Sequence, residues 1–233
     1  MLPIRCCRFT VGMSRIAPTV APSRRTRMVV LGILAVAVAV IVIRRPLLMA
    51  APRCLAGRWH GCYDTENGVV LMTLAGLPLA AVLVLLLARL RGGLRKPLAE
   101  VGIVYGTLPF LWMTMMPGVG AGVVAGRVSL VPLRDLVTMG PIGIGGNLLV
   151  FAALGFFAPI RFTALASVPR ILALGAGGSA LIEVAQYVFR LDRVSSVDDV
   201  LLNAAGAVLA GLASRRWWRT RARRALGGVT GSR

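Results

Sequence analysis

The sequence predicts an all-α integral membrane protein, a bundle of about six transmembrane helices. Hydrophobic residues make up 57% of the 233 residues and charged residues 15%, whereas soluble domains have about 45–50% and 25%. The 27 lysines and arginines outnumber the 8 acidic residues, and they lie between long apolar runs rather than within them. This pattern is typical of a multi-span membrane protein with basic flanks. It excludes a soluble enzyme, a disordered basic tail and a disulfide-rich scaffold.

Six apolar runs approach the length of about 20 residues that a transmembrane helix requires. They cover residues 28–43, 69–88, 101–117, 141–160, 171–189 and 197–213. The third run has a possible extension through the glycine-rich stretch 118–126. The last three runs carry polar residues in their middle, so they hold the candidate functional residues.

The first run is also compatible with a secretory signal, because Arg24, Arg25 and Arg27 precede it. Arg44 and Arg45 follow it directly, however, and no small-x-small cleavage site comes before them. We therefore expect a retained span. Met13 and Met28 are alternative starts of translation.

The distribution of cations predicts the orientation. Segments 1–27, 89–100, 161–170 and 214–233 hold 19 of the 27 lysines and arginines, which places both termini in the cytoplasm. The two end segments are then basic cytoplasmic tails. In the second tail, Trp217 and Trp218 beside the arginines favour an interfacial anchor over the alternative, a nucleic-acid-binding tail.

The cysteines and the single histidine give little evidence of chemistry. Cys54 and Cys62 fall in the first external connection, where a disulfide is permitted. Cys6 and Cys7 lie in the cytoplasmic tail and are expected to be unpaired. We interpret His60 as a solvated loop residue rather than a metal ligand. No metal site and no cofactor are predicted.

Polar residues in the last three spans share helix faces. Their spacing places Ser179, Glu183, Gln186 and Arg190 on one face of the fifth span, Asp199 and Asn203 on one face of the sixth, and Asn147 on the fourth. At about 1.5 Å per residue, Asn147, Glu183 and Asn203 each lie about 9–10 Å below the outer end of their span. We expect one polar layer in the outer half of the membrane, either a shared pocket or a set of groups that satisfy one another.

Glycines and serines beside this layer suggest local structure. Glycines 143, 145, 146, 175, 177 and 178 allow either close helix packing or a local opening onto a water-filled cavity. Ser195–Asp198 and Ser196–Asp199 both fit the Ser-x-x-acid capping pattern. Arg190 and Arg193 lie within reach of these aspartates for ion pairs.

Two ordered motifs resemble the signatures of VanZ-like membrane proteins. Asn147, Phe151 and Gly155 fit Asn-x-x-x-Phe-x-Pro-x-Gly, with Ala153 in place of the proline, so the helix kink that the proline brings stays an open question at this position. The second signature is matched by Ser179, Glu183, Gln186, Arg193, Asp198, Asp199, Asn203 and Gly206. One extra residue separates Gln186 from Arg193, and we prefer Arg193 to Arg190 as the matching arginine. Pro132 fits a proline that usually precedes these motifs.

The resemblance is strongest over residues 131–212, within a VanZ-like membrane domain of residues 69–213. Residues 28–68 then form an additional N-terminal span with its external loop. The resemblance implies a multi-pass protein of the bacterial plasma membrane. The named family member is linked to low-level resistance to the glycopeptide teicoplanin, and no reaction is implied.

The residues and the resemblance together suggest a protein that binds a lipophilic or lipid-linked envelope ligand in the outer polar layer. A lipid-linked envelope precursor and a lipophilic antibiotic are the candidate partners, besides the bilayer itself; nucleic acid is not expected. Glu183 would be the main acceptor, with Arg193 and Asp199 near the mouth. The alternatives are an intramembrane lipid-modifying enzyme with Glu183 as general acid/base, a small proton-coupled transporter, and a polar network that only fixes helix packing. No catalytic residue is assigned, and the oligomeric state stays open.

Overall fold

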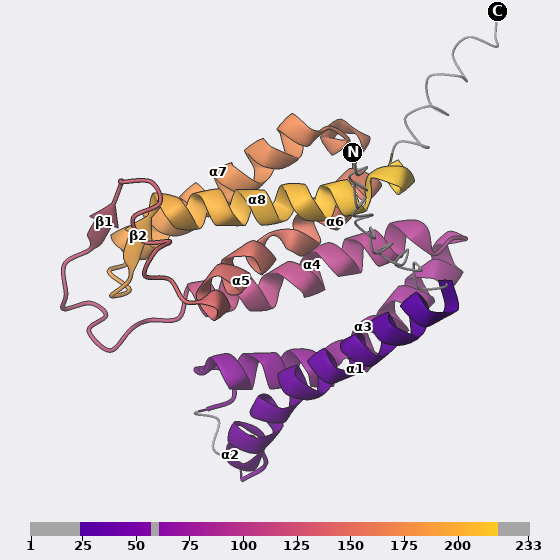
Figure 1. The fold of residues 1–233 in the computed structure, drawn as a ribbon, viewed down its shortest axis with the longest axis horizontal. Helices are drawn as coiled ribbons and strands as arrows, with labels where there is room; N and C mark the ends of the chain where they lie inside the picture. Colours follow the sequence, from indigo (N-terminus) through magenta and orange to yellow (C-terminus); the bar gives the residue numbers. More distant parts are fainter. Residues whose placement is uncertain (1–23, 57–60, 219–233) are drawn as a thin grey trace, which may run out of the picture. The chain divides into compact units, whose positions relative to one another are not determined.

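The structure, a computed structural model, describes residues 24–56 and 61–218 and is mostly helical. The chain divides into two units, residues 1–44 and 45–233. The helices and strands are α1 (Arg24–Met49), α2 (Ala51–Leu55), α3 (Glu66–Arg91), α4 (Arg95–Thr114), β1 (Arg127–Ser129), α5 (Pro141–Val150), α6 (Ala152–Arg161), a 3-10 turn (Thr163–Leu165), α7 (Val168–Val188), β2 (Val194–Ser196) and α8 (Val197–Ala213) (Figure 1). Residues 24–44 of the first unit belong to α1.

Four helical segments of the described chain are long and apolar enough to cross a membrane. They are Val30–Met49, Glu66–Arg91, Pro141–Arg161 and Val168–Val188. Helices α4 and α8 coincide with the other two predicted runs but are not among the four. Helix α8 has only 17 residues, and α4 begins with charged side chains that include Arg95 and Lys96. The structure thus supports a helical membrane protein, while six spans and cytoplasmic termini stay predictions.

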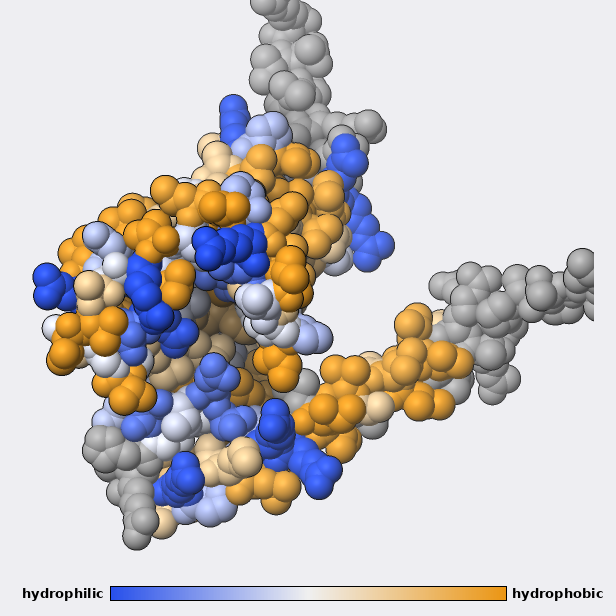
Figure 2. Space-filling model, turned by 60° about the vertical axis from the view of Figure 1, so that its left-hand side comes forward, coloured by the Kyte–Doolittle hydropathy of each residue, from blue (hydrophilic) through white to orange (hydrophobic). Residues whose placement is uncertain are grey.

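Hydrophobic side chains cover extended areas of the helical surface, interrupted by clusters of hydrophilic residues (Figure 2). Leu79 and Leu181, for example, are 74% and 71% exposed. Exposed leucines on long helices are what a hydrocarbon environment requires, because lipid tails replace the protein core as their neighbours.

Helix α8 packs against α5, α6 and α7 of the second unit (Figure 1). Glycines allow its backbone to touch its neighbours. A Cβ added at Gly206 would overlap the Leu148 carbonyl of α5, and one at Gly155 of α6 would overlap the backbone of Ala207. Any side chain at these two positions would therefore push the helices apart.

The other glycines of the polar spans divide into two groups. Gly175 faces Ala204 and Ala207 of α8, and Gly178 faces the ring of Phe151. A Cβ at glycine 145, 146 or 177 would meet nothing within 4 Å. Close packing, one of the two expected roles, thus belongs to only part of the predicted glycine set.

The predicted fourth run is two helices rather than one. Helices α5 and α6 meet at Phe151, whose φ of −110° and ψ of 11° lie outside the helical region. A proline does not cause this interruption, since Ala153 occupies the position at which the VanZ-like signature has proline. Phe151 is buried in the core with Ile171, Ile182 and Ala207, and the two half-helices contact α8 on either side of it. Tertiary packing therefore accounts for the break.

The glycine-rich stretch 118–126 does not extend α4, so the possible extension of the third run does not occur. Helix α4 ends at Thr114, and the following residues form turns. The Gly118 N–H donates to the Leu191 carbonyl at 2.8 Å, and the Gly122 N–H donates to the Arg190 carbonyl at 2.9 Å. Strands β1 and β2 then pair in parallel, with Val128 opposite Ser195. The connection before α5 is thus fastened to the connection between α7 and α8.

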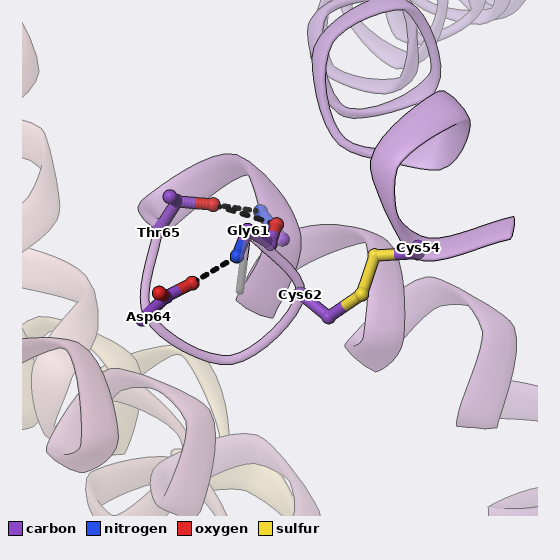
Figure 3. Close-up of a disulfide and its surroundings, with 6 residues drawn as sticks. Cys54, Gly61, Cys62, Asp64 and Thr65 are labelled. Carbon is purple, nitrogen blue, oxygen red and sulfur yellow. Dashed lines mark hydrogen bonds between the residues drawn. A yellow bond between two sulfur atoms is a disulfide. The ribbon is translucent and has the colours of Figure 1, made fainter. Parts of the chain in front are cut away.

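Cys54 and Cys62 form a disulfide between α2 and the loop before α3 (Figure 3). The Thr65 hydroxyl caps α3 by accepting a hydrogen bond from the Gly68 N–H at 3.1 Å. A disulfide is typical of an oxidising compartment, which agrees with the predicted external position of this loop. Cys6, Cys7 and His60 lie outside the described residues.

The tryptophans after α8 differ from each other. Trp218 is buried against Ala99 and Ile160, and its indole N–H donates to the Gly211 carbonyl at 3.1 Å. Trp217 is 40% exposed. Trp218 is therefore part of the helical core, and an interfacial position remains available to Trp217 alone of this pair. The arginine-rich residues from 219 onward lie outside the described chain.

Candidate functional site

Glu183 of α7 binds the first residues of the segment that leads into α8. Its carboxylate oxygen Oε2 accepts a hydrogen bond from the Ser196 N–H at 2.9 Å. The Ser195 hydroxyl donates to the carbonyl oxygen of Glu183 at 2.8 Å. Glu183 itself is 8% exposed. The carboxylate is thus buried and held by the backbone N–H of Ser196, the last residue of β2.

Ser196 is the N-cap of α8, as the sequence predicts, because its hydroxyl accepts a hydrogen bond from the Asp198 N–H at 3.2 Å. The reciprocal half of a capping box would join Asp199 to the Ser196 N–H. That part of the prediction was wrong, since Glu183 of another helix accepts this bond. Both aspartates are left to make contacts with other elements.

Asp198 holds the loop that precedes α5. Its two carboxylate oxygens accept hydrogen bonds from the N–H groups of Leu133, Asp135 and Leu136, at 2.5, 2.9 and 3.0 Å. The side chain is almost wholly buried. Leu133 has a φ of 66°, an uncommon conformation for a residue other than glycine. The Asp198 carboxylate therefore fixes a turn that the local sequence alone does not favour.

Asp199 and Asn147 join α8 to α5. The Asn147 amide donates to the Asp199 oxygen Oδ1 at 2.7 Å, and both side chains are half-buried. Asp199 and Arg193 are ionisable side chains in the electrostatic surroundings of the buried Glu183 carboxyl group. Three ionisable side chains thus gather at this end of the bundle.

A second polar contact lies one helical turn further along α7 and α8. The Asn203 amide donates to the Ser179 hydroxyl at 2.7 Å, and both residues are buried. The oxygen Oδ1 of Asn203 has no hydrogen-bond partner in the described part of the protein. The sequence predicts that Asn147 and Asn203 lie at the same depth. In the structure Asn147 bonds Asp199, which lies four residues, or about 6 Å, before Asn203 along α8. The single predicted layer is therefore two adjacent layers.

Gln186 and Arg193 bind the C-terminal end of α4. The Gln186 amide donates to the Thr114 carbonyl at 2.9 Å. The Arg193 guanidinium donates to the carbonyls of Met116 and Met113 at 3.1 and 3.3 Å. A cation at this position complements the partial negative charge of a helix C-terminus.

The ion pairs that the sequence allows between the loop arginines and the two aspartates do not form. Within residues 24–56 and 61–218, no salt bridge joins Arg190 or Arg193 to Asp198 or Asp199. The physical reason is competition, because backbone carbonyls engage Arg193 and backbone N–H groups engage Asp198. Arg190 instead has a φ of 49° and supplies a carbonyl to the loop pairing.

Two further aspartates belong to the same region and were not singled out by sequence. Asp135 accepts a hydrogen bond from the Ser196 hydroxyl at 2.6 Å, which lowers the pKa of the Asp135 carboxyl. Asp192, with a φ of 55°, accepts a hydrogen bond from the Gly120 N–H at 2.9 Å and pairs with Arg127 at 3.4 Å. Their position could have identified them, because both are acidic residues in connections that the sequence predicts to be external.

All eight predicted site residues lie on elements that meet around one end of α8. They contact one another, the loop before α5 or the end of α4; they are Asn147, Ser179, Glu183, Gln186, Arg193, Asp198, Asp199 and Asn203. We call this set the polar network. In the described residues, no three His, Cys, Asp or Glu side chains are arranged to hold a metal ion. The network offers buried carboxylates, amides and one exposed guanidinium.

A sequence model of the VanZ/LLP1 family matches residues 79–218, which is more than half of the chain. The match begins within α3 and includes the whole polar network. No curated protein and no solved structure matches the sequence. The chain therefore belongs to the VanZ/LLP1 family.

Proposed function

We propose that this protein binds a lipophilic or lipid-linked envelope ligand at the polar network, in the plasma membrane of a bacterium, and so influences susceptibility to teicoplanin. The observation that supports this proposal is the gathering of Arg193, Asp199 and Glu183 at the predicted external end of the bundle. Glycopeptides and lipid-linked precursors carry charged and amide groups that such a set can recognise.

Arg193 is the best-placed group for an anionic part of the ligand. A guanidinium carries five N–H donors, and the carbonyls of Met113 and Met116 engage only part of them. The side chain is exposed, so the remaining donors are accessible to a phosphate or carboxylate. Asp199 then supplies an acceptor for an amide, hydroxyl or ammonium group of the same ligand.

The test compares variants at equal protein abundance. Arg193→Gln and Asp199→Asn are expressed in a teicoplanin-susceptible bacterium, and growth inhibition and membrane abundance are both measured. We expect either variant to shift teicoplanin susceptibility relative to the unaltered protein without a loss of abundance. Arg134→Gln, an exposed loop variant with the same change in charge as Arg193→Gln, is the control and should have no effect. A loss of abundance together with the phenotype would instead assign the network a packing role.

Glu183 distinguishes the binder from the two alternatives in which its carboxyl group exchanges a proton, the enzyme and the transporter. A general acid/base and a proton-coupled transporter both need a carboxyl group that exchanges a proton. Binding as an acceptor is retained in Glu183→Gln, because the amide oxygen can accept the Ser196 N–H. Purified protein is therefore incubated with labelled lipid substrates, and substrate turnover is followed. Turnover that is lost in Glu183→Gln would favour the enzyme over the binder.

A further inference from the structure

A groove lies between α3 and α4, away from the polar network. Its volume is about 750 Å³, within the usual range of ligand pockets, about 300–1,000 Å³. Its walls are mostly aliphatic and include Leu79, Ala80 and Leu83 of α3 and Val104 and Leu108 of α4. None of the eight network side chains lines it. The groove is therefore a separate feature of the fold, with α4 as its connection to the network.

The polar groups on the walls of the groove are already bonded. The Tyr105 hydroxyl donates to the Thr73 carbonyl of α3. The Trp112 indole N–H donates to the Tyr63 carbonyl at 2.7 Å. Because these donors are engaged within the protein, the middle of the groove presents hydrocarbon to its occupant. A hydrocarbon chain fits such a surface, whereas a polar ligand would leave its own groups unsatisfied.

One end of the groove is positively charged. Glu100 lines this end and forms ion pairs with Arg91 and with Arg161, the latter at 2.6 Å. The bond from Arg161 lowers the pKa of Glu100, so this carboxyl is ionised at neutral pH and is matched by two arginines. Arg95 and Lys96 lie exposed in the first turn of α4. Four cations against one carboxylate leave this end with a net positive charge.

We propose that the groove binds an acyl chain of one anionic phospholipid, whose phosphate lies among Arg91, Arg95 and Lys96. The apolar walls hold the chain, and the cationic end selects the headgroup. In the predicted orientation this end faces the cytoplasm, where juxtamembrane lysines and arginines meet anionic headgroups. The site does not depend on the proposed function, because its residues differ from those of the polar network.

The test uses photoactivatable lipids on the purified full-length protein in phosphatidylcholine vesicles. Phosphatidylglycerol and phosphatidylcholine, each with a diazirine on one acyl chain, are crosslinked in parallel, and the labelled residues are mapped by mass spectrometry. We expect phosphatidylglycerol to label α3 and α4 groove residues about fivefold more than phosphatidylcholine, since one cation near the surface changes binding by about this factor. Equal labelling by the two lipids, or even labelling of all helices, would overturn the proposal.

Variants separate the groove from the surrounding bilayer. Ala80→Trp fills the groove and should reduce labelling there by about fourfold for each CH₂ group of the acyl chain that the indole displaces. Ala81→Trp, on the neighbouring exposed position, should leave labelling unchanged. Arg91→Gln should reduce the preference for phosphatidylglycerol, whereas Arg134→Gln should not. If Ala80→Trp does not fold, competition decides: unlabelled phosphatidylglycerol must displace the probe from the unaltered protein better than phosphatidylcholine does, and failure to do so contradicts the site.

Discussion

The carboxylate of Glu183 accepts the backbone N–H of Ser196, at 2.9 Å, where α8 begins. One helix of the bundle thus completes the N-terminal cap of another. A buried N–H group without a partner costs about 1–3 kcal/mol, so this single contact affects both the stability of α8 and its position against α7.

Glu183→Ala is therefore expected to lower the free energy of unfolding by about 1–3 kcal/mol, because the Ser196 N–H then lacks its acceptor. Glu183→Gln retains an acceptor oxygen and should cost less. Thermal unfolding of the purified protein in detergent measures both changes. Equal losses in the two variants would contradict a role for the hydrogen bond.

Asp198→Ala removes the acceptor of three backbone N–H groups at once. We expect the N–H groups of Leu133, Asp135 and Leu136 to exchange hydrogen much faster, because each becomes open to solvent. Hydrogen–deuterium exchange followed by mass spectrometry measures the rate for this loop. Asp192→Ala is the matched control, since it should release the Gly120 N–H and leave the Leu133–Leu136 segment protected.

Gly206→Ala and Gly145→Ala form a pair that tests helix packing. At Gly206 the new methyl group would overlap the Leu148 carbonyl, whereas at Gly145 it would meet nothing within 4 Å. We expect Gly206→Ala to destabilise the protein by about 1–3 kcal/mol. Gly145→Ala should be neutral or stabilise by up to about 1 kcal/mol, because alanine favours the helix. Unfolding temperatures that change equally in both variants would refute the close approach of α5 and α8.

The loop around Asp135 should lose stability in acid. Its hydrogen bond from Ser196 lowers the pKa of the Asp135 carboxyl below the ordinary value of 3.8. A carboxyl whose pKa is lower in the folded state stabilises that state above its unfolded pKa, and this contribution is lost as the pH falls through the folded value. Proteolysis of residues 118–140 between pH 5 and about pH 2.5 should therefore increase with acidity. Asp135→Asn should weaken this dependence, and an unchanged profile would contradict it.

The sequence predicted the helices well and their contacts poorly, for different physical reasons. The apolar runs locate α3, α4, α7 and α8 because hydrocarbon solvation acts on each helix separately. The break at Phe151 was missed because no proline signals it, and it arises from contacts with α8. The shared helix face of Ser179, Glu183 and Gln186 follows from helical periodicity.

The partners of those residues could not be derived in the same way. Glu183 bonds a backbone N–H 13 residues later in the chain, and Asp198 bonds a turn in which Leu133 adopts a positive φ. Contacts of this kind depend on where loops return in three dimensions. The short strands β1 and β2 have no recognisable sequence pattern. The pairing of the loop before α5 with the loop before α8 therefore could not be predicted from the sequence.

The hydrogen bonds of Asp198 also join parts of the chain that are made at different times during synthesis. The N–H groups that it binds belong to residues made 62 to 65 positions earlier. In a nascent chain that turn therefore lacks its carboxylate acceptor until Asp198 has been made and α8 has formed. A chain that ends before α8 would leave the N–H groups of Leu133, Asp135 and Leu136 without this acceptor.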